Sequence, residues 1–534
     1  MTVFAILVAV AALIAALMKM KRDLMMLQQN SYRNDRFRHW MAESKDSTSM
    51  VNLVGWVIFF LCLLAIMPHW LGMTLVGLFA SWVMLRLGTE HYKKPLVWTA
   101  RAKRIYGVTI FLVAATLLIP IFAATSGGVM QRFFNVAVFL VFVFCCADAY
   151  MLAANWLLGP VERRINKKYY DEAAKMLRSM PDLKVIGITG SYGKTSTKHY
   201  LNRILSEQFD VLMTPGNFNT TLGVIRTVRE QMKPYNEIFI AEMGAKQRGD
   251  IKEICDLVHP QIGIITAVGP QHLESFGTIE NVQRTKFELA DALPADGLAV
   301  VNNDFEPIAE RKVDNVECVR YSTNPDAGAD YYASDIQYTP QGTTFAIYDK
   351  EGEKVIDLHT RLVGSCNVSN LVAAVIVALR LGMNKDKIRY AVENIEQVEH
   401  RLSMKRTPAG ITIIDDAYNS NPVGSKMALE VLSGMKGGKR IIITPGMVEL
   451  GQNQEDLNRK FGEEIARSVD VAIVVGEYNR KAITEGFNAA AAMLEEKPQL
   501  IESATFAEAQ QEMLKMAKAG DTVLYENDLP DTFK

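Results

Sequence analysis

Five long apolar runs occupy the first 160 residues, and they limit what this part of the chain can fold into. The runs lie at about residues 1–18, 51–67, 71–87, 106–124 and 133–158. Each is close to the ~20 residues that an α-helix needs to cross a bilayer. Buried core helices are the alternative, but five runs with Trp and Tyr near their ends favour a transmembrane region over residues 1–160.

Basic residues between these runs predict an orientation. Lys and Arg follow the first, third and fifth runs, whereas the links after the second and fourth carry only one Arg. Positive charge favours the cytoplasmic side, so we expect the N-terminus outside and everything after residue 160 in the cytoplasm. The expected protein is a multi-pass protein of the inner or plasma membrane, with a juxtamembrane linker at residues 161–180. Asp148, inside the fifth run, is either a functional carboxylate or a packing contact, and we favour a packing or interface role.

Overall charge and cysteine content exclude some classes of protein. The formal net charge of −1 gives no indication of a nucleic-acid partner. The six cysteines are scattered, with neither the C-x-x-C spacing of a metal site nor a disulfide framework. This pattern is typical of a soluble part in a reducing cytoplasm.

From residue 181 the pattern becomes that of an α/β protein. Short apolar strands, such as 237–241, 262–266 and 298–301, alternate with helix-like segments at 199–206, 249–258 and 279–293. This alternation predicts a parallel sheet covered by helices. Residues 331–338, 343–348 and 354–358 favour short antiparallel strands, followed by an apolar helix over 367–381. A second α/β unit has expected strands at 411–415, 440–444, 471–475 and 522–525. We therefore predict an α-helical transmembrane region, a P-loop domain at 181–398 and a Rossmann-like domain at 399–534.

The stretch Val185–Thr197 favours a phosphate site. It reads as a strand, a glycine turn containing Gly190 and Gly193, and a helix that begins near Lys194. Glycines let backbone N–H groups approach an anion, and the helix N-terminus adds positive potential. Ile188 occupies the position of the first glycine in the usual G-x-x-x-x-G-K-[ST] pattern, so an ordinary glycine-rich turn is the alternative.

Three further polar positions lie at strand ends or on a following helix. Glu242 directly follows an apolar strand, where an acidic side chain could share a Mg²⁺ ion with Thr195 or serve only as a strand-end carboxylate. His272 follows the next strand, although a lone histidine is more often structural. Lys286 lies on a helix beyond it.

The order of nine short motifs resembles the Mur ligase family, and most closely its D-alanyl-D-alanine-adding branch. The resemblance covers about residues 181–534, and its motifs are GSYGKTS, NFNTTLG, EMGAK, GPQHLESFG, RTKFE, NVSN, HRL, DDAYNSNP and GMVELG. No single motif is decisive, but nine in this order are specific together.

The resemblance implies a role for particular residues. It implies ATP and two Mg²⁺ ions, with Lys194, Glu242, His272 and Lys286 as catalytic residues. The metal ligands would be Thr195, Glu242, His272 and a carbamylated Lys286. The nucleotide would be bound by Gly190, Ser191, Gly193, Lys194, Thr195, Ser196, Asn367, Asn370, Arg401, Asp416 and Tyr418. The substrate would meet Asn217, Asn219, Thr220 and Asn421.

The implied reaction is an ATP-dependent carboxylate–amine ligation in the cell envelope. A carboxylate becomes an acyl phosphate, which an amine attacks; the phosphoryl charge requires metal, lysine and helix-end amides. Expected partners are the lipid bilayer, a cell-wall precursor and other envelope-synthesis proteins. The simplest reaction is D-Ala-D-Ala addition to a muramoyl-peptide; a lipid-linked acceptor, an idle nucleotide-binding scaffold and a P-loop transporter are the alternatives.

The sequence departs from this family at five places. The five apolar runs stand where the family has its N-terminal UDP-binding domain, so a UDP-linked acceptor is in doubt. Cys366 replaces a common His, and Gly446 replaces an Asp. Residues 525–530 replace the Lys-Gly-Ser stretch associated with the incoming dipeptide, and the chain ends at Lys534, short of a last helix, so the amine donor stays open.

Overall fold

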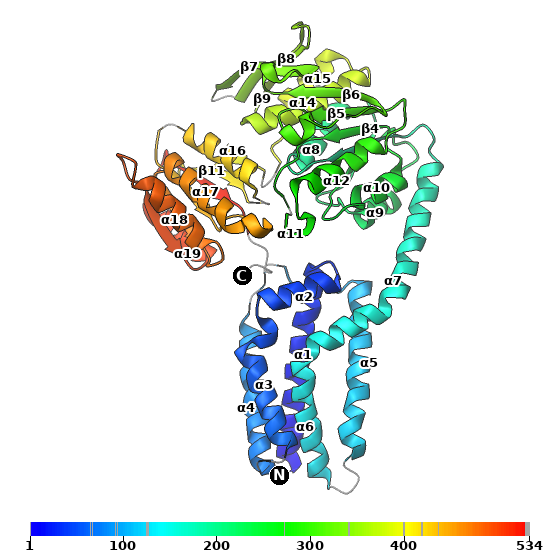
Figure 1. Ribbon diagram of the computed structural model, residues 1–534, viewed down its shortest axis with the longest axis vertical. Coiled ribbons are helices and arrows are strands. Elements are labelled where there is room, and N and C mark those ends of the chain that lie inside the picture. Colours follow the sequence, from blue (N-terminus) through cyan, green and yellow to red (C-terminus); the bar gives the residue numbers. More distant parts are fainter. Residues whose placement is uncertain are drawn as a thin grey trace. The chain divides into compact units, whose positions relative to one another are not determined.

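The structure is a computed structural model that describes all residues except 1, 65, 67, 91, 93, 124–127, 272, 340–341, 399–400, 418–419, 436 and 529–534. Contacts divide the described chain into two units, one over Met1–Lys167 and one over Lys168–Leu529 (Figure 1). The first is helical and the second is α/β, as the composition predicts.

The first unit is a bundle of helices around α1. Its elements are α1 (Thr2–Gln29), α2 (Asn34–Glu43), η1 (Asp46–Thr48), α3 (Met50–Leu63), α4 (His69–Thr89), α5 (Ala100–Ala123), α6 (Val129–Cys145) and α7 (Ala147–Arg178), which continues into the second unit. α1 packs against α4 and α6 through buried small side chains at Ala5, Ala9, Ala12 and Ala16. Small residues at this spacing let helix backbones approach closely.

The number of helices long enough to cross a membrane differs from the prediction. Among the described residues α1, α4 and α5 reach that length and apolar composition, and α6 with α7 makes a fourth if the bent pair counts as one span. The predicted span at 51–67 appears as α3, whose 14 residues are short for a ~30 Å hydrocarbon core. The predicted span at 133–158 is broken near Cys146, where α6 and α7 bend by 69°. By length and composition the described helices thus give three candidate spans, or four, where the sequence predicts about five.

The second unit begins with a nine-stranded sheet in the order β2-β3-β1-β4-β5-β6-β7-β8-β9. Pairing is parallel from β2 to β7 and antiparallel from β7 to β9. The strands are β1 (Lys184–Thr189), β2 (Val211–Met213), β3 (Ile238–Glu242), β4 (Ile262–Ile265), β5 (Leu298–Asn302), β6 (Glu317–Ser322), β7 (Tyr331–Thr339), β8 (Gly342–Asp349) and β9 (Lys354–Thr360). The predicted antiparallel strands therefore extend the parallel sheet and do not form a separate one.

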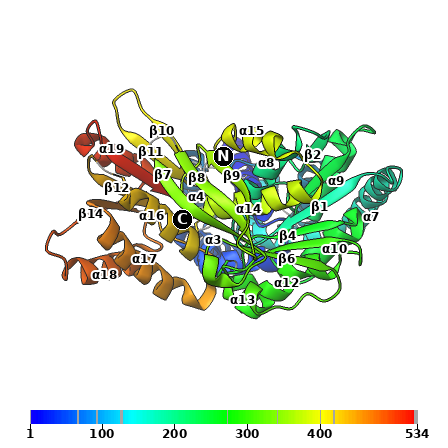
Figure 2. The same ribbon diagram turned by 90° about the horizontal axis from the view of Figure 1, so that it is seen from above.

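Helices cover both faces of this sheet because its strands are apolar on both sides. They are α8 (Lys194–Leu205), α9 (Thr221–Gln231), α10 (Asp250–Val258), α11 (Leu273–Phe276), α12 (Ile279–Asp291), α13 (Glu306–Ala309), η2 (Pro325–Ala327), α14 (Ser365–Arg380) and α15 (Lys385–Glu393). Ile186 and Ile188 of β1 join the core under α8, α14 and α15, whereas Val185 joins the core under α9, α10 and α12. Figure 2 shows α8 and α15 on one side of the strands and α10 and α12 on the other.

A six-stranded sheet follows, in the order β10-β11-β15-β12-β13-β14, parallel except for β10. Its strands are β10 (Ser403–Arg406), β11 (Thr412–Asp416), β12 (Arg440–Thr444), β13 (Val471–Val475), β14 (Gln499–Ser503) and β15 (Thr522–Glu526). Its helices are α16 (Pro422–Ser433), η3 (Gly451–Asn453), α17 (Gln454–Ser468), α18 (Arg480–Ala491) and α19 (Phe506–Met516). Ile442 and Leu524 face α16, α17 and α18, and Ile441 and Val523 face α19. The predicted second α/β unit is present, and the ends of its four expected strands lie within a residue or two of their expected positions.

Candidate active site

The loop between β1 and α8 is shaped by its glycines. Gly190 has φ of 154°, and a Cβ there would lie 2.1 Å from Thr266 Oγ1. Gly193 has φ of 77°, and a Cβ there would lie 2.4 Å from Asn370 Oδ1. A side chain at either position would collide with buried groups, so the sequence needs glycine here. The Ser191 N–H donates to Ala267 O at 2.7 Å and ties the loop to the end of β4.

Lys194 begins α8 and folds back over this loop. Its Nζ donates to Gly190 O at 2.6 Å and to Ser191 O at 3.2 Å. Burial lowers the pKa of Lys194 to about 8, although Glu242 acts in the opposite direction. The ammonium therefore lies in the loop, beside the N-terminus of α8, where helix-end amides favour an anion.

Glu242 gathers three side chains at the carboxyl end of β3. Thr195 Oγ1 donates to its Oε1 at 3.1 Å, and Asn219 Nδ2 donates to the same atom at 3.2 Å. Lys198 Nζ lies 3.0 Å from its Oε2. Burial is the largest single effect and raises the pKa of Glu242, but Lys198, Lys194 and Asn219 together outweigh it and lower the pKa. The carboxylate is therefore ionised, with a hydroxyl beside it, as the predicted Thr195–Glu242 pair requires.

Lys198 is the member of this group that the sequence reasoning missed. It is completely buried, and its Nζ also donates to Gly216 O at 2.6 Å. The available signal was its position one helical turn after Lys194, on the P-loop helix. Lys198 thus joins the strand-end carboxylate to the loop before Asn217 and Asn219.

The oxygen atoms present fit a Mg²⁺ ion. Thr195 and Glu242 supply a hydroxyl and a carboxylate, and Mg²⁺ commonly takes one or two protein oxygens, with water and phosphate oxygens completing its shell. No group of three His, Cys, Asp or Glu side chains that could hold a metal occurs within the described ranges. His272, predicted as a ligand of a second ion, lies outside the residues that the structure describes.

Lys286 lies on α12 and is 2% exposed. Burial lowers its pKa well below the usual lysine range, and the nearby Lys194 cation lowers it further. Both effects favour the neutral amine over the ammonium form. Glu288, two residues further along α12, instead accepts from Gly249 N at 2.7 Å and Lys252 N at 3.0 Å and so caps α10.

A cavity of about 660 Å³ lies along the P-loop. Most of the predicted nucleotide residues line it, namely Ser191, Gly193, Lys194, Thr195, Ser196, Asn367, Asn370, Arg401 and Asp416, and so does Asn421. Gly190 does not line the cavity, but its carbonyl accepts from Lys194 Nζ within the loop. Tyr418 lies outside the described residues. Burial raises the pKa of Asp416 to about 6, against the lowering effect of Arg401.

Two residues predicted to bind the nucleotide, Asn367 and Asn370, form hydrogen bonds with other side chains of the protein. Asn370 Oδ1 accepts from Thr197 Oγ1 at 3.1 Å, and Asn367 Oδ1 accepts from Tyr200 OH at 2.7 Å. These bonds hold α14 against α8, so both asparagines shape the cavity wall.

The residues predicted to meet the substrate have different contacts in the structure. Asn219 contacts Glu242, whereas Asn217 is exposed and Thr220 caps α9 by accepting from Gly223 N at 3.3 Å. Asn421 caps α16, with its Oδ1 accepting from Gly424 N at 2.8 Å. The structure therefore brings only Asn219 directly to the Glu242 carboxylate.

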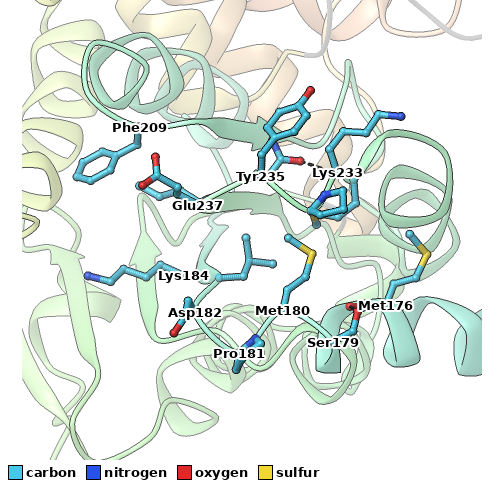
Figure 3. A pocket seen from close by; sticks show the side chains of 15 residues that line it. Met176, Ser179, Met180, Pro181, Asp182, Lys184, Phe209, Lys233, Tyr235 and Glu237 are labelled. Carbon is cyan, nitrogen blue, oxygen red and sulfur yellow. Dashed lines mark hydrogen bonds between the residues drawn. The ribbon is translucent and has the colours of Figure 1, made fainter.

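A second cavity, of about 570 Å³, lies at the opposite ends of the strands (Figure 3). Lys184 and Ile238, the first residues of β1 and β3, line it together with Met180 and Tyr235. Thr189 and Glu242 end the same two strands, so this second cavity is separated from the P-loop by the length of these strands.

Comparison with known proteins identifies the family. The Mur ligase middle domain matches residues 188–378, and the Mur ligase glutamate ligase domain matches residues 400–525. The chain belongs to the Mur ligase family.

Similar proteins carry one name. The UDP-N-acetylmuramoyl-tripeptide–D-alanyl-D-alanine ligase of Escherichia coli K12 is 30% identical over 323 residues, 59% of this chain and 69% of the relative. The Bacillus subtilis 168 protein of the same name is also 30% identical, over 53% of this chain and 60% of its own length.

Solved structures of MurF are similar too. MurF from Acinetobacter baumannii has a TM-score of 0.60 and 27% identity, over 68% of this chain and 77% of its own. MurF from Thermotoga maritima in complex with ADP has a TM-score of 0.60 and 25% identity, over 68% of this chain and 80% of its own.

Proposed function

We propose that this protein is a membrane-anchored, ATP- and Mg²⁺-dependent ligase that joins a carboxylate of a cell-wall precursor to an amine. The observation that carries the proposal is that Lys194 and Thr195 line the cavity and that Thr195 donates to the buried Glu242 carboxylate. The simplest substrates are those in the names of the relatives, a UDP-muramoyl-tripeptide and D-Ala-D-Ala.

The residues act by positioning and charge stabilisation. Lys194 and the N–H groups at the start of α8 would hold the transferring phosphoryl group, whose charge grows during transfer. Mg²⁺, held by Thr195 and Glu242, would neutralise phosphate charge when bound. Lys198 keeps Glu242 ionised and oriented. The acceptor carboxylate attacks the γ-phosphorus, ADP leaves, and the amine then displaces phosphate from the acyl phosphate.

We further propose that Lys286 reacts with CO₂ to form a carbamate, which with His272 would hold a second Mg²⁺. Only the neutral amine is nucleophilic, and burial beside Lys194 favours that form. The product carries negative charge, so the nearby Lys194 cation would stabilise it.

The helical unit supports placement in a membrane. Large apolar side chains point outward from several of its helices: Phe111 is 71% exposed, Phe122 69% and Trp156 73%. An apolar surface of this kind is unfavourable in water and suits lipid. The exposed apolar surface of the helical unit also favours a second candidate substrate, a lipid-linked acceptor. The orientation with the N-terminus outside and the α/β unit in the cytoplasm is part of this proposal.

The test is phosphate release from ATP by the full chain in detergent, over pairs of acceptors and amines. Release that requires both partners, and that Lys194→Ala abolishes while Lys233→Ala does not, would establish a ligase. Lys233 is the control because it lies at the far cavity. Turnover only with UDP-muramoyl-tripeptide and D-Ala-D-Ala, or only with lipid-linked acceptors, would decide the substrate. ATP binding without turnover with any pair would indicate a scaffold.

A further inference from the structure

A buried carboxyl group lies directly behind the wall of the nucleotide cavity. Glu526, the last residue of β15, is completely buried. It is the register partner of Asp416 on the neighbouring parallel strand β11, so both side chains leave the same face of the sheet. Asp416 lines the cavity, and Glu526 does not.

Glu526 belongs to a cluster of four oxygen contacts. Its Oε1 lies 2.6 Å from Ser420 Oγ and 2.9 Å from Ser425 Oγ. The two hydroxyls lie 2.6 Å from each other, and Ser425 Oγ lies 2.8 Å from Asn421 O. Each serine hydroxyl has one hydrogen to donate. If Glu526 is ionised, the two serine hydrogens serve only two of these four contacts, and two pairs of oxygen atoms are left in contact without a hydrogen between them.

A proton on Glu526 completes the arrangement. Glu526 then donates to Ser420, Ser420 donates to Ser425, and Ser425 donates to the Asn421 carbonyl. Three hydrogens form three consecutive bonds in one direction, and the fourth contact needs none. We propose that Glu526 is a positioning residue of the nucleotide site, which holds the Ser420–Ser425 turn through this chain only while it carries a proton.

The surrounding charges agree with a protonated Glu526. Its Oε2 is buried without a hydrogen-bond partner among the described residues, which is tolerable for a neutral carbonyl oxygen and costly for a carboxylate. Asp416 is the charged group facing it, Ser420 and Ser425 face it from the following turn and helix, and Arg401 acts on Asp416. Burial and Asp416 raise the pKa of Glu526 well above its usual range.

The Ser420–Ser425 turn, which these hydrogen bonds hold in place, shapes the cavity. Asn421, whose carbonyl accepts the last of these hydrogen bonds, caps α16. It lines the cavity with Gly424 and Lys426. Asn527 fastens the same region from the other side, accepting from Ser420 N at 3.3 Å and donating to Gly446 O at 2.5 Å. Loss of the Glu526 proton would therefore loosen the wall that faces the P-loop.

The inference rests on the proposed nucleotide site, and its test separates the two. ADP affinity is measured by calorimetry on the full chain in detergent, from mildly acidic to alkaline pH, for wild type, Glu526→Gln, Glu526→Ala and Ser425→Ala. Infrared spectra at neutral pH report protonated carboxyl groups without any nucleotide. The amide of Gln can donate from the same position as the protonated acid.

We expect Glu526→Gln to bind ADP as wild type does at neutral pH and to keep its affinity at alkaline pH, where wild type weakens. Glu526→Ala and Ser425→Ala should bind about tenfold more weakly, the effect of about one lost hydrogen bond. The protonated-carboxyl band should vanish in Glu526→Gln. A wild-type spectrum without that band, or a Glu526→Gln affinity that falls with pH as in wild type, would overturn the inference. Absence of ADP binding by wild type would reject the proposed function, and the infrared band would still decide the state of Glu526.

Discussion

Thr195 Oγ1 lies 3.1 Å from Glu242 Oε1, although 47 positions separate the two residues in the chain. β1 and β3 are parallel neighbours, so the helix that follows β1 starts beside the carboxyl end of β3. Strand order thus brings together the two side chains that we propose as metal ligands, and four variants test this site and its surroundings.

Glu242→Gln should abolish most metal-dependent turnover. The amide keeps the shape of the side chain but removes the charge that faces the ion, so we expect kcat to fall by about 10²–10³ or more. ATP binding without Mg²⁺ should change little. Glu237→Gln is the matched control, because Glu237 lies just before the same strand and accepts from Asp210 N at 2.9 Å. Equal losses in both variants would contradict a metal role.

Lys198→Met should destabilise the fold, since it leaves the Glu242 carboxylate buried without its cation. Breaking a buried ion pair on one side costs about 3–5 kcal/mol of unfolding free energy. The double variant Lys198→Met/Glu242→Gln should recover part of that loss, because the uncompensated charge is gone. Urea unfolding of the three variants measures this; simple additivity would show that the two side chains are not coupled.

Lys286→Ala should remove activity while leaving the fold intact, and wild-type activity should depend on dissolved CO₂. A carbamate forms only while CO₂ is available, so degassed buffer should lower turnover and bicarbonate should restore it. Incubation with ¹³C-bicarbonate should give a carbamate NMR signal that Lys286→Ala lacks. Lys252→Ala, at an exposed lysine on α10, is the control. A signal that persists in Lys286→Ala would refute the assignment.

Asp416→Asn should make the stability less dependent on pH. Burial raises the pKa of Asp416 to about 6 in the fold, against about 3.9 in an unfolded chain. A carboxyl group whose folded pKa is raised favours the fold while protonated, so the wild-type unfolding free energy should fall as pH rises from about 4 to about 6. Asp416→Asn should lack that decline. Parallel stability curves for the two proteins would show that Asp416 titrates normally.

Local sequence was sufficient for the elements and for the phosphate loop. The alternation of apolar strands with amphipathic helices predicts the parallel sheets, and Gly190 and Gly193 mark a turn that only glycine can adopt. Asp148 is half-buried in the first turn of α7, and its packing role stays a prediction. Fewer described helices reach membrane-crossing length than the five apolar runs predict, because hydropathy does not register the bend near Cys146 or the early end of α3.

The sequence by itself determined the family, the order of the two sheets and the glycine turn before α8, because these depend on short segments read in order. Only the tertiary structure decided which carboxylates are ionised and which are protonated. Glu242 faces a buried Lys198, whereas Glu526 faces Asp416 and two serines from segments about a hundred residues earlier in the chain. Both are strand-end glutamates in the sequence. The pKa of a buried carboxyl group depends on the groups packed around it, and those come together only when the sheet forms.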